Sequence, residues 1–208
     1  MLRYNAIILL VCAMMGVSNA HADDDVVDIL VFGDSLVAGY GILAEEAFPS
    51  RLEVALQERG HQVRLVNAGV SGDTTGGGVA RLGWSLSEDI DAVILELGAN
   101  DALQGLPPQQ AKENLAVMIE EIRSRGLPLL LAGMRAPPNL GRTYVEAFDS
   151  IYPALSEEYG IALYPFFLEG VALVPSLNLP DGLHPNPNGV ETIVRRILPY
   201  VEKLLLEK

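Results

Sequence analysis

Cysteine is almost absent from this sequence, which has a single one, Cys12, among 208 residues. One cysteine cannot form an internal disulfide or a thiolate cluster for a metal ion. Cys12 also lies in an N-terminal segment that we expect to be removed, which would leave a chain without any thiol. Thiol chemistry and covalent cross-links are therefore not expected in this protein.

Positive charge is also scarce. The sequence has 14 Lys and Arg against 27 Asp and Glu, and its formal net charge is −13. A surface of this sign repels phosphate backbones, so we expect no nucleic-acid partner. The acidic run at residues 23–25 is interpreted as a solvated segment rather than a metal site, and no metal is expected.

Hydrophobic runs long enough to cross a bilayer are lacking at the N-terminus. The apolar stretch at residues 6–17 has 12 residues, whereas a spanning helix needs about 20. Arg3 precedes this stretch, and the small-x-small sequence Ala-His-Ala follows it at residues 20–22. This order is typical of a secretory signal peptide. We therefore predict a signal peptide at 1–22, one domain at 23–208, export to the periplasm or the medium, and no stable membrane anchor.

Apolar strand-like runs alternate with helical patterns along the rest of the chain. The predicted strands are residues 26–32, 62–69, 91–98, 127–134 and 161–167. The predicted helices are residues 48–60, 78–86, 107–126, 143–160 and 186–207, with an N-cap at Asn186 or Asn188 and breaks or bends at Pro153 and Pro199. Such alternation predicts an α/β fold: a five-stranded parallel sheet between two helical layers, with a flavodoxin-like strand order as the default.

Small and polar residues follow several of these strands. The segments are "GDSL" (33–36), "GVSGDTT" (69–75) and "GAND" (98–101), and "DGLH" (181–184) lies well after the fifth strand. Open α/β sheets bind ligands beyond the carboxyl ends of their strands, so we expect these four segments to share one edge.

Histidine is the third scarce residue, and its scarcity limits the choice of a general base. His21 lies in the predicted signal peptide, and His61 lies at the opposite end of a predicted strand, where we interpret it as a turn residue. His184 follows Asp181 by three residues, and a carboxylate there could orient the imidazole. The alternative is a plain turn built from Asp, Gly, Pro and Asn.

Ser35 is the candidate nucleophile, because it follows a buried strand and begins a predicted short helix whose N–H groups favour anions. The alternative is a helix N-cap. The backbone N–H groups of Ser35 and Gly72 and the side-chain amide of Asn100 are candidate oxyanion donors, although the last two are also common turn residues.

Three acidic residues accompany this set. Glu96 lies inside a predicted buried strand, where we expect an arginine or a backbone partner because an unpaired buried charge is very costly. Asp34 and Asp73 flank the candidate site, and we interpret them as turn-stabilising or supporting groups rather than catalysts.

Four segments, "FGDSLVAGYG" (32–41), "NAGVSGDTT" (67–75), "LELGAND" (95–101) and "DGLHPN" (181–186), resemble the four sequence blocks of the SGNH, or GDSL, hydrolases. Within that family, the chain is similar to the bacterial periplasmic thioesterase, lysophospholipase and arylesterase group over nearly all of residues 28–200. The resemblance implies Ser35 as nucleophile, His184 as base and Asp181 as its orienting group. It also implies an oxyanion hole made by Ser35, Gly72 and Asn100, and no cofactor.

The resemblance further implies that the loop "DALQGLPP" (101–108) contributes to acyl-chain binding, with Leu103 and Leu106 as candidate contacts. The expected function is hydrolysis of small-molecule or lipid esters and thioesters through an acyl-enzyme, by a monomer. A carbohydrate O-acetylesterase and a non-catalytic lipid-binding protein are the alternatives. A nucleotide-binding protein is disfavoured, because Asp34 would repel a phosphate group after the first strand.

Overall fold

A five-stranded parallel sheet forms the centre of the protein. The computed structural model describes residues 26–206, so the predicted signal peptide and the acidic run at 23–25 lie outside the described residues. The strands are β1 (Val27–Gly33), β2 (Val63–Gly69), β3 (Ala92–Glu96), β4 (Leu129–Ala132) and β5 (Ala162–Tyr164). Their order is β2-β1-β3-β4-β5, and all neighbouring strands are parallel. The predicted sheet and its flavodoxin-like order are confirmed.

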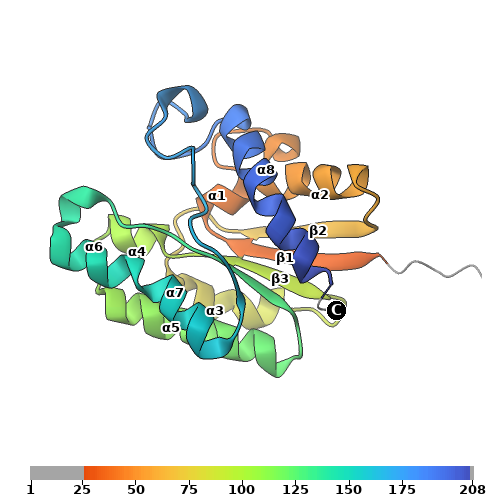
Figure 1. Ribbon diagram of the computed structural model, residues 1–208, viewed down its shortest axis with the longest axis horizontal. Coiled ribbons are helices and arrows are strands. Elements are labelled where there is room, and N and C mark those ends of the chain that lie inside the picture. The colour runs from red at the N-terminus through yellow and green to blue at the C-terminus, as the bar shows by residue number, and fades with distance from the viewer. Residues whose placement is uncertain (1–25, 207–208) are drawn as a thin grey trace, which may run out of the picture.

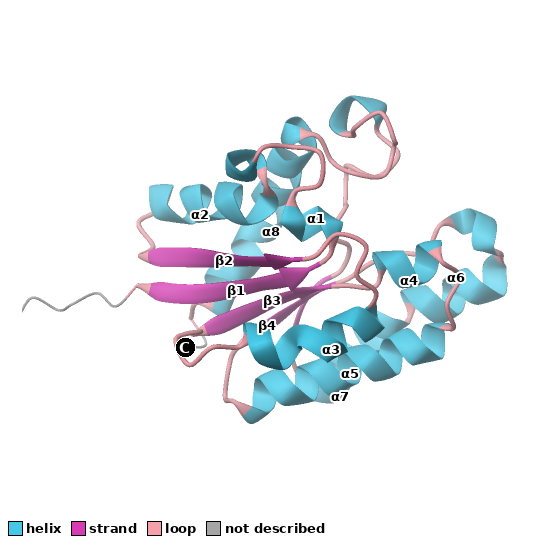
Figure 2. Ribbon diagram, turned by 180° about the vertical axis from the view of Figure 1, so that it is seen from behind, coloured by secondary structure: helices cyan, strands magenta, loops and turns pink. Residues whose placement is uncertain are grey.

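Helices cover both faces of the sheet (Figures 1 and 2). One layer contains α1 (Ser35–Ala38), α2 (Phe48–Glu58) and α8 (Pro187–Leu204), and the other contains α3 (Thr75–Ser85), α5 (Pro108–Ser124) and α7 (Ile151–Tyr159). Two further helices, α4 (Ala99–Leu103) and α6 (Arg142–Asp149), lie beyond the carboxyl ends of the strands. The predicted α/β/α arrangement is therefore confirmed. None of the helices in residues 26–206 has the length and apolar character that a membrane crossing requires.

The helix boundaries follow local signals. Asn186 caps α8, because its side chain accepts a hydrogen bond from the Gly189 N–H at 3.1 Å. The predicted helix at 143–160 is split into α6 and α7 at Ser150, three residues before Pro153, as expected from the missing proline N–H. Pro199, in contrast, lies within α8 without interrupting it.

The predicted bounds of three elements were wrong for reasons that bear on function. Helix α3 begins at Thr75 rather than at 78, despite three poor helix formers at 76–78, because Thr74 caps it through the Gly77 N–H. Strands β4 and β5 are shorter than the apolar runs that predicted them. Beyond their carboxyl ends, Met134 and Phe166 line a cavity, whereas Phe167 packs in the core against Phe48, so none of these apolar residues extends the sheet.

Candidate active site

Ser35 lies at the junction between strand β1 and the first turn of α1. The side chain of Asp34 caps this helix by accepting a hydrogen bond from the Leu36 N–H at 2.9 Å. The N-cap is therefore Asp34, and the alternative interpretation of Ser35 as a structural cap is wrong. Ser35 is 9% exposed and has its hydroxyl at the carboxyl edge of the sheet.

The structure brings together Ser35, His184 and Asp181. The distance from His184 Nε2 to Ser35 Oγ is 3.0 Å, and that from His184 Nδ1 to Asp181 Oδ2 is 2.7 Å. If Nδ1 donates its proton to the carboxylate, Nε2 has a free lone pair that accepts the serine hydroxyl proton. The loop at 181–184 therefore does more than form a turn.

Asp181 remains ionised at any pH where the imidazole can act as a base. Its Oδ1 accepts hydrogen bonds from the backbone N–H groups of His184 at 3.0 Å and Leu183 at 2.9 Å. These bonds, with that from the His184 ring, lower the pKa of Asp181 to about 2. The carboxylate is thus fixed in position by its own turn and stabilises a proton on His184.

Two backbone donors near the Ser35 hydroxyl have no protein acceptor. In the described part of the chain, neither the Ser35 N–H nor the Gly72 N–H donates a hydrogen bond. Gly72 has a φ of +87° in the turn after β2, a conformation that residues with a side chain rarely adopt. Unpaired N–H groups of this kind suit a developing oxyanion.

Asn100, the third predicted donor, is already engaged. Its Nδ2 donates to Asp34 Oδ2 at 3.0 Å and to the backbone oxygen of Asp73 at 2.8 Å. Both amide hydrogens are therefore used to join the segments that follow β1, β2 and β3. Contact with an oxyanion requires one of these hydrogens to be shared with the substrate.

A pair of buried carboxyl groups, Asp34 and Glu96, lies next to Ser35. Glu96, fully buried at the end of β3, accepts a hydrogen bond from the Asp34 N–H at 3.3 Å. Burial, followed by the charge of Asp34, raises the pKa of Glu96 well above its usual range. Burial also raises the pKa of Asp34, to about 6, although hydrogen bonds from Leu36 and Glu96 oppose this. We infer that Glu96 carries the proton and Asp34 the charge near neutral pH. The expected backbone partner of Glu96 is confirmed, whereas the expected arginine is not.

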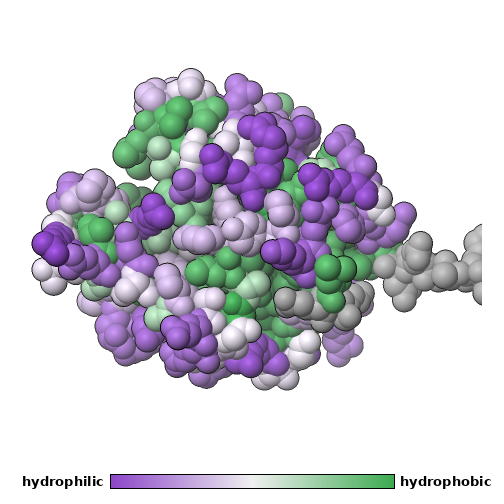
Figure 3. Space-filling view, viewed as in Figure 1, coloured by the Kyte–Doolittle hydropathy of each residue, from purple (hydrophilic) through white to green (hydrophobic). Residues whose placement is uncertain are grey.

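A cavity of about 500 Å³ begins beside Ser35 and His184 and extends over the ends of β3, β4 and β5. Ser35, Asn100 and His184 lie among its lining residues. Its apolar walls include Leu36, Leu103, Met134, Phe166, Leu168, Leu173 and Leu183. In Figure 3, the segment that follows β5 forms an apolar prominence that a notch separates from the lobe of α4 and α6. A cavity of this character suits an acyl chain.

The structure separates the predicted substrate contacts. Leu103 lines the cavity, whereas Leu106 is not among its lining residues, and its backbone oxygen accepts a hydrogen bond from the Tyr144 hydroxyl at 2.7 Å. Sequence reasoning missed Met134 and Phe166, which lie just past β4 and β5. The signal that could have found them is the length of the apolar runs, which exceeds that of the strands.

His61, the other described histidine, lies at the opposite edge of the sheet. Its side chain is 34% exposed, and its Nε2 is 3.4 Å from Glu202. Its predicted place at the entry to β2, away from the candidate site, is confirmed.

Comparison with known proteins supports the same chemistry. Residues 31–191 match the GDSL-like Lipase/Acylhydrolase family. The chain is 43% identical over 178 residues to an arylesterase from Vibrio mimicus, covering 85% of this chain and 89% of that protein. It is 42% identical over 159 residues to thioesterase 1/protease 1/lysophospholipase L1 from Escherichia coli K12, covering 76% and 75%. A crystal structure of TesA superposes with a TM-score of 0.81 at 39% identity, covering 85% of this chain and 99% of that one. The chain therefore belongs to the GDSL-like lipase/acylhydrolase family, whose relatives found here are esterases and thioesterases.

Proposed function

We propose that the protein is a serine esterase that hydrolyses carboxylic esters or thioesters through an acyl-enzyme, with Ser35, His184 and Asp181 as its catalytic residues. The observation that carries this proposal is the continuous hydrogen-bonded series from Ser35 Oγ through the His184 ring to Asp181. Nucleophile, base and orienting group are each within hydrogen-bond distance of the next, which is the arrangement that acyl transfer requires.

The reaction follows from this geometry. His184 Nε2 takes the proton of Ser35 as the serine oxygen attacks the carbonyl carbon, and the N–H groups of Ser35 and Gly72 and the Asn100 amide receive the developing oxyanion. The protonated imidazole then gives its proton to the departing alcohol, phenol or thiol. Water, deprotonated by the same imidazole, hydrolyses the acyl-enzyme and releases the carboxylic acid.

The cavity favours an acyl group longer than acetyl. Its walls are predominantly apolar, and burying each methylene group contributes about 0.8 kcal/mol. This observation supports acyl or aryl esters and thioesters over acetylated carbohydrates. Ester turnover that is lost in Ser35→Ala would distinguish the protein from a lipid-binding protein without activity.

The proposal extends to location and assembly. The composition of residues 1–22 supports export through a signal peptide, to the periplasm or the medium. Every residue of the proposed catalytic set comes from one chain, which supports an active monomer.

A direct test uses p-nitrophenyl acetate, butyrate and octanoate with the wild-type protein, Ser35→Ala and the control Ser124→Ala, whose hydroxyl donates to the Glu121 backbone oxygen in α5. We expect wild type and Ser124→Ala to turn over all three esters, with kcat/KM rising from acetate to butyrate. Ser35→Ala should remain folded and lose turnover, and an alkyl fluorophosphonate should modify wild type once, at Ser35. Full activity in folded Ser35→Ala would refute the assignment.

A further inference from the structure

Arg81 of α3 contacts three segments that lead to the oxyanion donors. It does not line the cavity, and it is not one of the hydrogen-bonded residues Ser35, His184 and Asp181. We propose that Arg81 is a positioning residue for the oxyanion hole. It holds the end of β1, the end of β2 and the turn that carries Gly72 in one arrangement. The inference rests on the proposed function, because it concerns how these donors reach a reacting ester.

The guanidinium group uses all three of its nitrogens. Nε of Arg81 is 2.6 Å from Asp73 Oδ2. Nη1 donates to the backbone oxygen of Ala68 at 2.9 Å, and Nη2 donates to that of Gly33 at 2.8 Å. The guanidinium group of arginine is planar and has N–H donors in fixed directions, so it can donate to three separate acceptors at once.

Each of these acceptors is close in sequence to an oxyanion donor. Gly33 lies two residues before Ser35, and Ala68 lies four residues before Gly72 at the end of β2. Asp73 follows Gly72 directly, and its backbone oxygen accepts the hydrogen bond from the Asn100 amide at 2.8 Å. One side chain therefore fixes the relative positions of all three donors.

Packing restricts Arg81 to this position. Its side chain is 22% exposed, and its guanidinium carbon lies 3.9 Å from the centroid of the Phe32 ring. Helix α3 approaches Asp73 closely because residue 77 is glycine, where a Cβ atom would lie 2.5 Å from Asp73 Oδ1. The glycines that weaken α3 as a helix thus permit the arginine to reach the turn.

Charge gives Arg81 a second effect on the same donors. Without the guanidinium, the Asp73 carboxylate would stand unpaired one residue from the Gly72 N–H. A negative charge there opposes the oxyanion that forms in the transition state, whereas it has little effect on the neutral ester. The loss of Arg81 should therefore lower kcat more than it raises KM.

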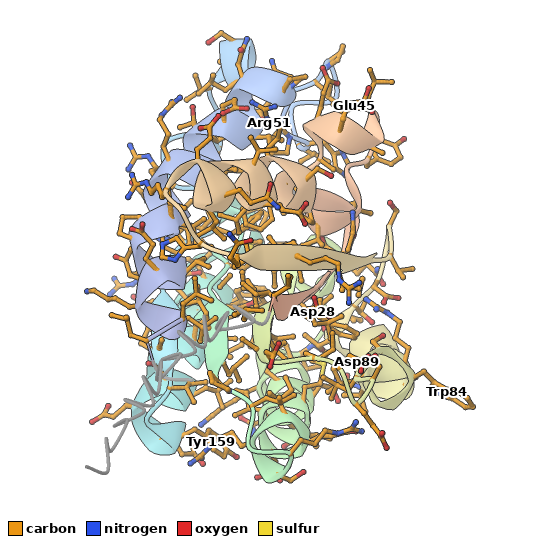
Figure 4. The ribbon with its side chains drawn as sticks, turned by 90° about the vertical axis from the view of Figure 1, so that its right-hand side faces the viewer. Asp28, Glu45, Arg51, Trp84, Asp89 and Tyr159 are labelled. Carbon is orange, nitrogen blue, oxygen red and sulfur yellow. The ribbon has the colours of Figure 1, made fainter. Side chains whose placement is uncertain are left out.

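The test compares Arg81→Gln, Arg81→Lys and the control Arg64→Gln. Arg64 pairs with Asp28 and so joins β2 to β1 at the amino edge of the sheet, which faces the viewer in Figure 4. With p-nitrophenyl butyrate, we expect Arg81→Gln to lower kcat by about 10- to 100-fold with KM changed by less than about 3-fold. Arg81→Lys keeps the charge but not the fork, and should lose about 3- to 10-fold. Arg64→Gln should keep the wild-type kcat.

A reversible trifluoromethyl ketone distinguishes positioning from general loss of structure, because its adduct with Ser35 places an oxyanion in the hole. Its inhibition constant should rise in Arg81→Gln by the same factor as kcat/KM falls, while that of the matching unreactive alkyl amide stays constant. Wild-type kcat in Arg81→Gln, or an equal loss of affinity for both inhibitors, would overturn the inference about Arg81 and leave the proposed function standing. An inactive wild-type protein would instead refute the proposed function.

Discussion

The two described histidines each pair with a carboxylate, at opposite edges of the same sheet. His184 is 2.7 Å from Asp181 at the carboxyl edge, and His61 is 3.4 Å from Glu202 at the amino edge. Only His184 has a serine hydroxyl at its other ring nitrogen, and only His184 lines the cavity, within residues 26–206. A histidine–carboxylate pair therefore does not indicate catalysis by itself, and the edge of the sheet on which it lies decides.

The same contrast holds for the acidic groups at the two edges. At the amino edge, Asp28 pairs with Arg64 and Glu202 with Arg59, so each charge is balanced by a cation near the surface. At the carboxyl edge, Asp34 and Glu96 are buried and receive hydrogen bonds from backbone N–H groups. Burial without a cation costs stability, but these hydrogen bonds hold the turn of Ser35 in place.

The largest expected effect on kcat/KM comes from removing each imidazole in turn, which tests the difference between His184 and His61. His184→Ala should lower kcat/KM for p-nitrophenyl butyrate by about 10⁴-fold or more, because the serine loses its proton acceptor. His61→Ala, its control, should remain within about 2-fold of wild type. A comparable loss in both variants would show that His61 acts in catalysis or that each change unfolds the protein, which circular dichroism would reveal.

The carboxylates provide the second test. Asp181→Asn should lower kcat/KM by about 10³- to 10⁴-fold, since an amide can neither select the imidazole tautomer nor stabilise its protonated form. Glu202→Gln removes the equivalent charge beside His61 and should leave kcat/KM unchanged. Steady-state kinetics on both variants would decide, and retention of activity in Asp181→Asn would argue that the backbone turn alone orients His184.

Much of this arrangement could be predicted from the sequence, because it depends on local order. Parallel strands place their carboxyl ends together, so Ser35 after β1 and Asn100 after β3 share one edge. The loop of His184 follows β5 by some distance, and the sequence only indicated that it could return to this edge. The chain-distant contacts could not be predicted. Arg81 reads as an ordinary exposed helix residue, and only the closeness of α3 to the turn after β2 shows what its guanidinium contacts.

The surroundings of buried residues are the other feature that the sequence leaves open. Glu96 was expected to have a partner, but the sequence did not indicate that its neighbour would be a second carboxyl group, Asp34, whose charge helps to raise the pKa of Glu96. Likewise, the apolar residues after β4 and β5 were assigned to strands, because periodicity does not distinguish a sheet interior from a cavity wall.

Replacing a buried acid by its amide should change the free energy of unfolding in opposite directions at the two edges of the sheet, Glu96 at the carboxyl edge and Asp28 at the amino edge. Because the pKa of Glu96 is raised in the folded protein, the unfolded chain releases this proton first as the pH rises above about 4.5. The free energy of unfolding therefore falls with pH from there up to the folded pKa. Asp34, with a pKa of about 6, adds a fall between about pH 4 and 6.

Glu96→Gln keeps the shape of the protonated acid and an oxygen that can accept from the Asp34 N–H. It should therefore gain stability on the order of 1 kcal/mol at pH 8, or about 2–4 °C in Tm. Asp28→Asn should instead lose stability at pH 8, because it leaves Arg64 without its partner. Thermal melts from pH 5 to 8 would show a flatter profile for Glu96→Gln. A steeper profile, or a lower Tm at pH 8, would contradict the assignment of the proton to Glu96.

The smallest expected effect concerns the ring of Tyr40, which contacts His184. The Tyr40 ring lies 4.4 Å from the His184 ring, centroid to centroid, at an interplanar angle of 34°, although Tyr40 is 53% exposed. The turn that carries it is tied to the nucleophile, since the Tyr40 N–H donates to the Ser35 backbone oxygen at 3.1 Å. Such ring pairs contribute about 0.5–1.5 kcal/mol.

Tyr40→Ala should therefore lower kcat/KM by about 2- to 10-fold, whereas Tyr40→Phe, which keeps the ring, should match wild type. Equal losses in both variants would assign the effect to the hydroxyl group and not to the contact with His184.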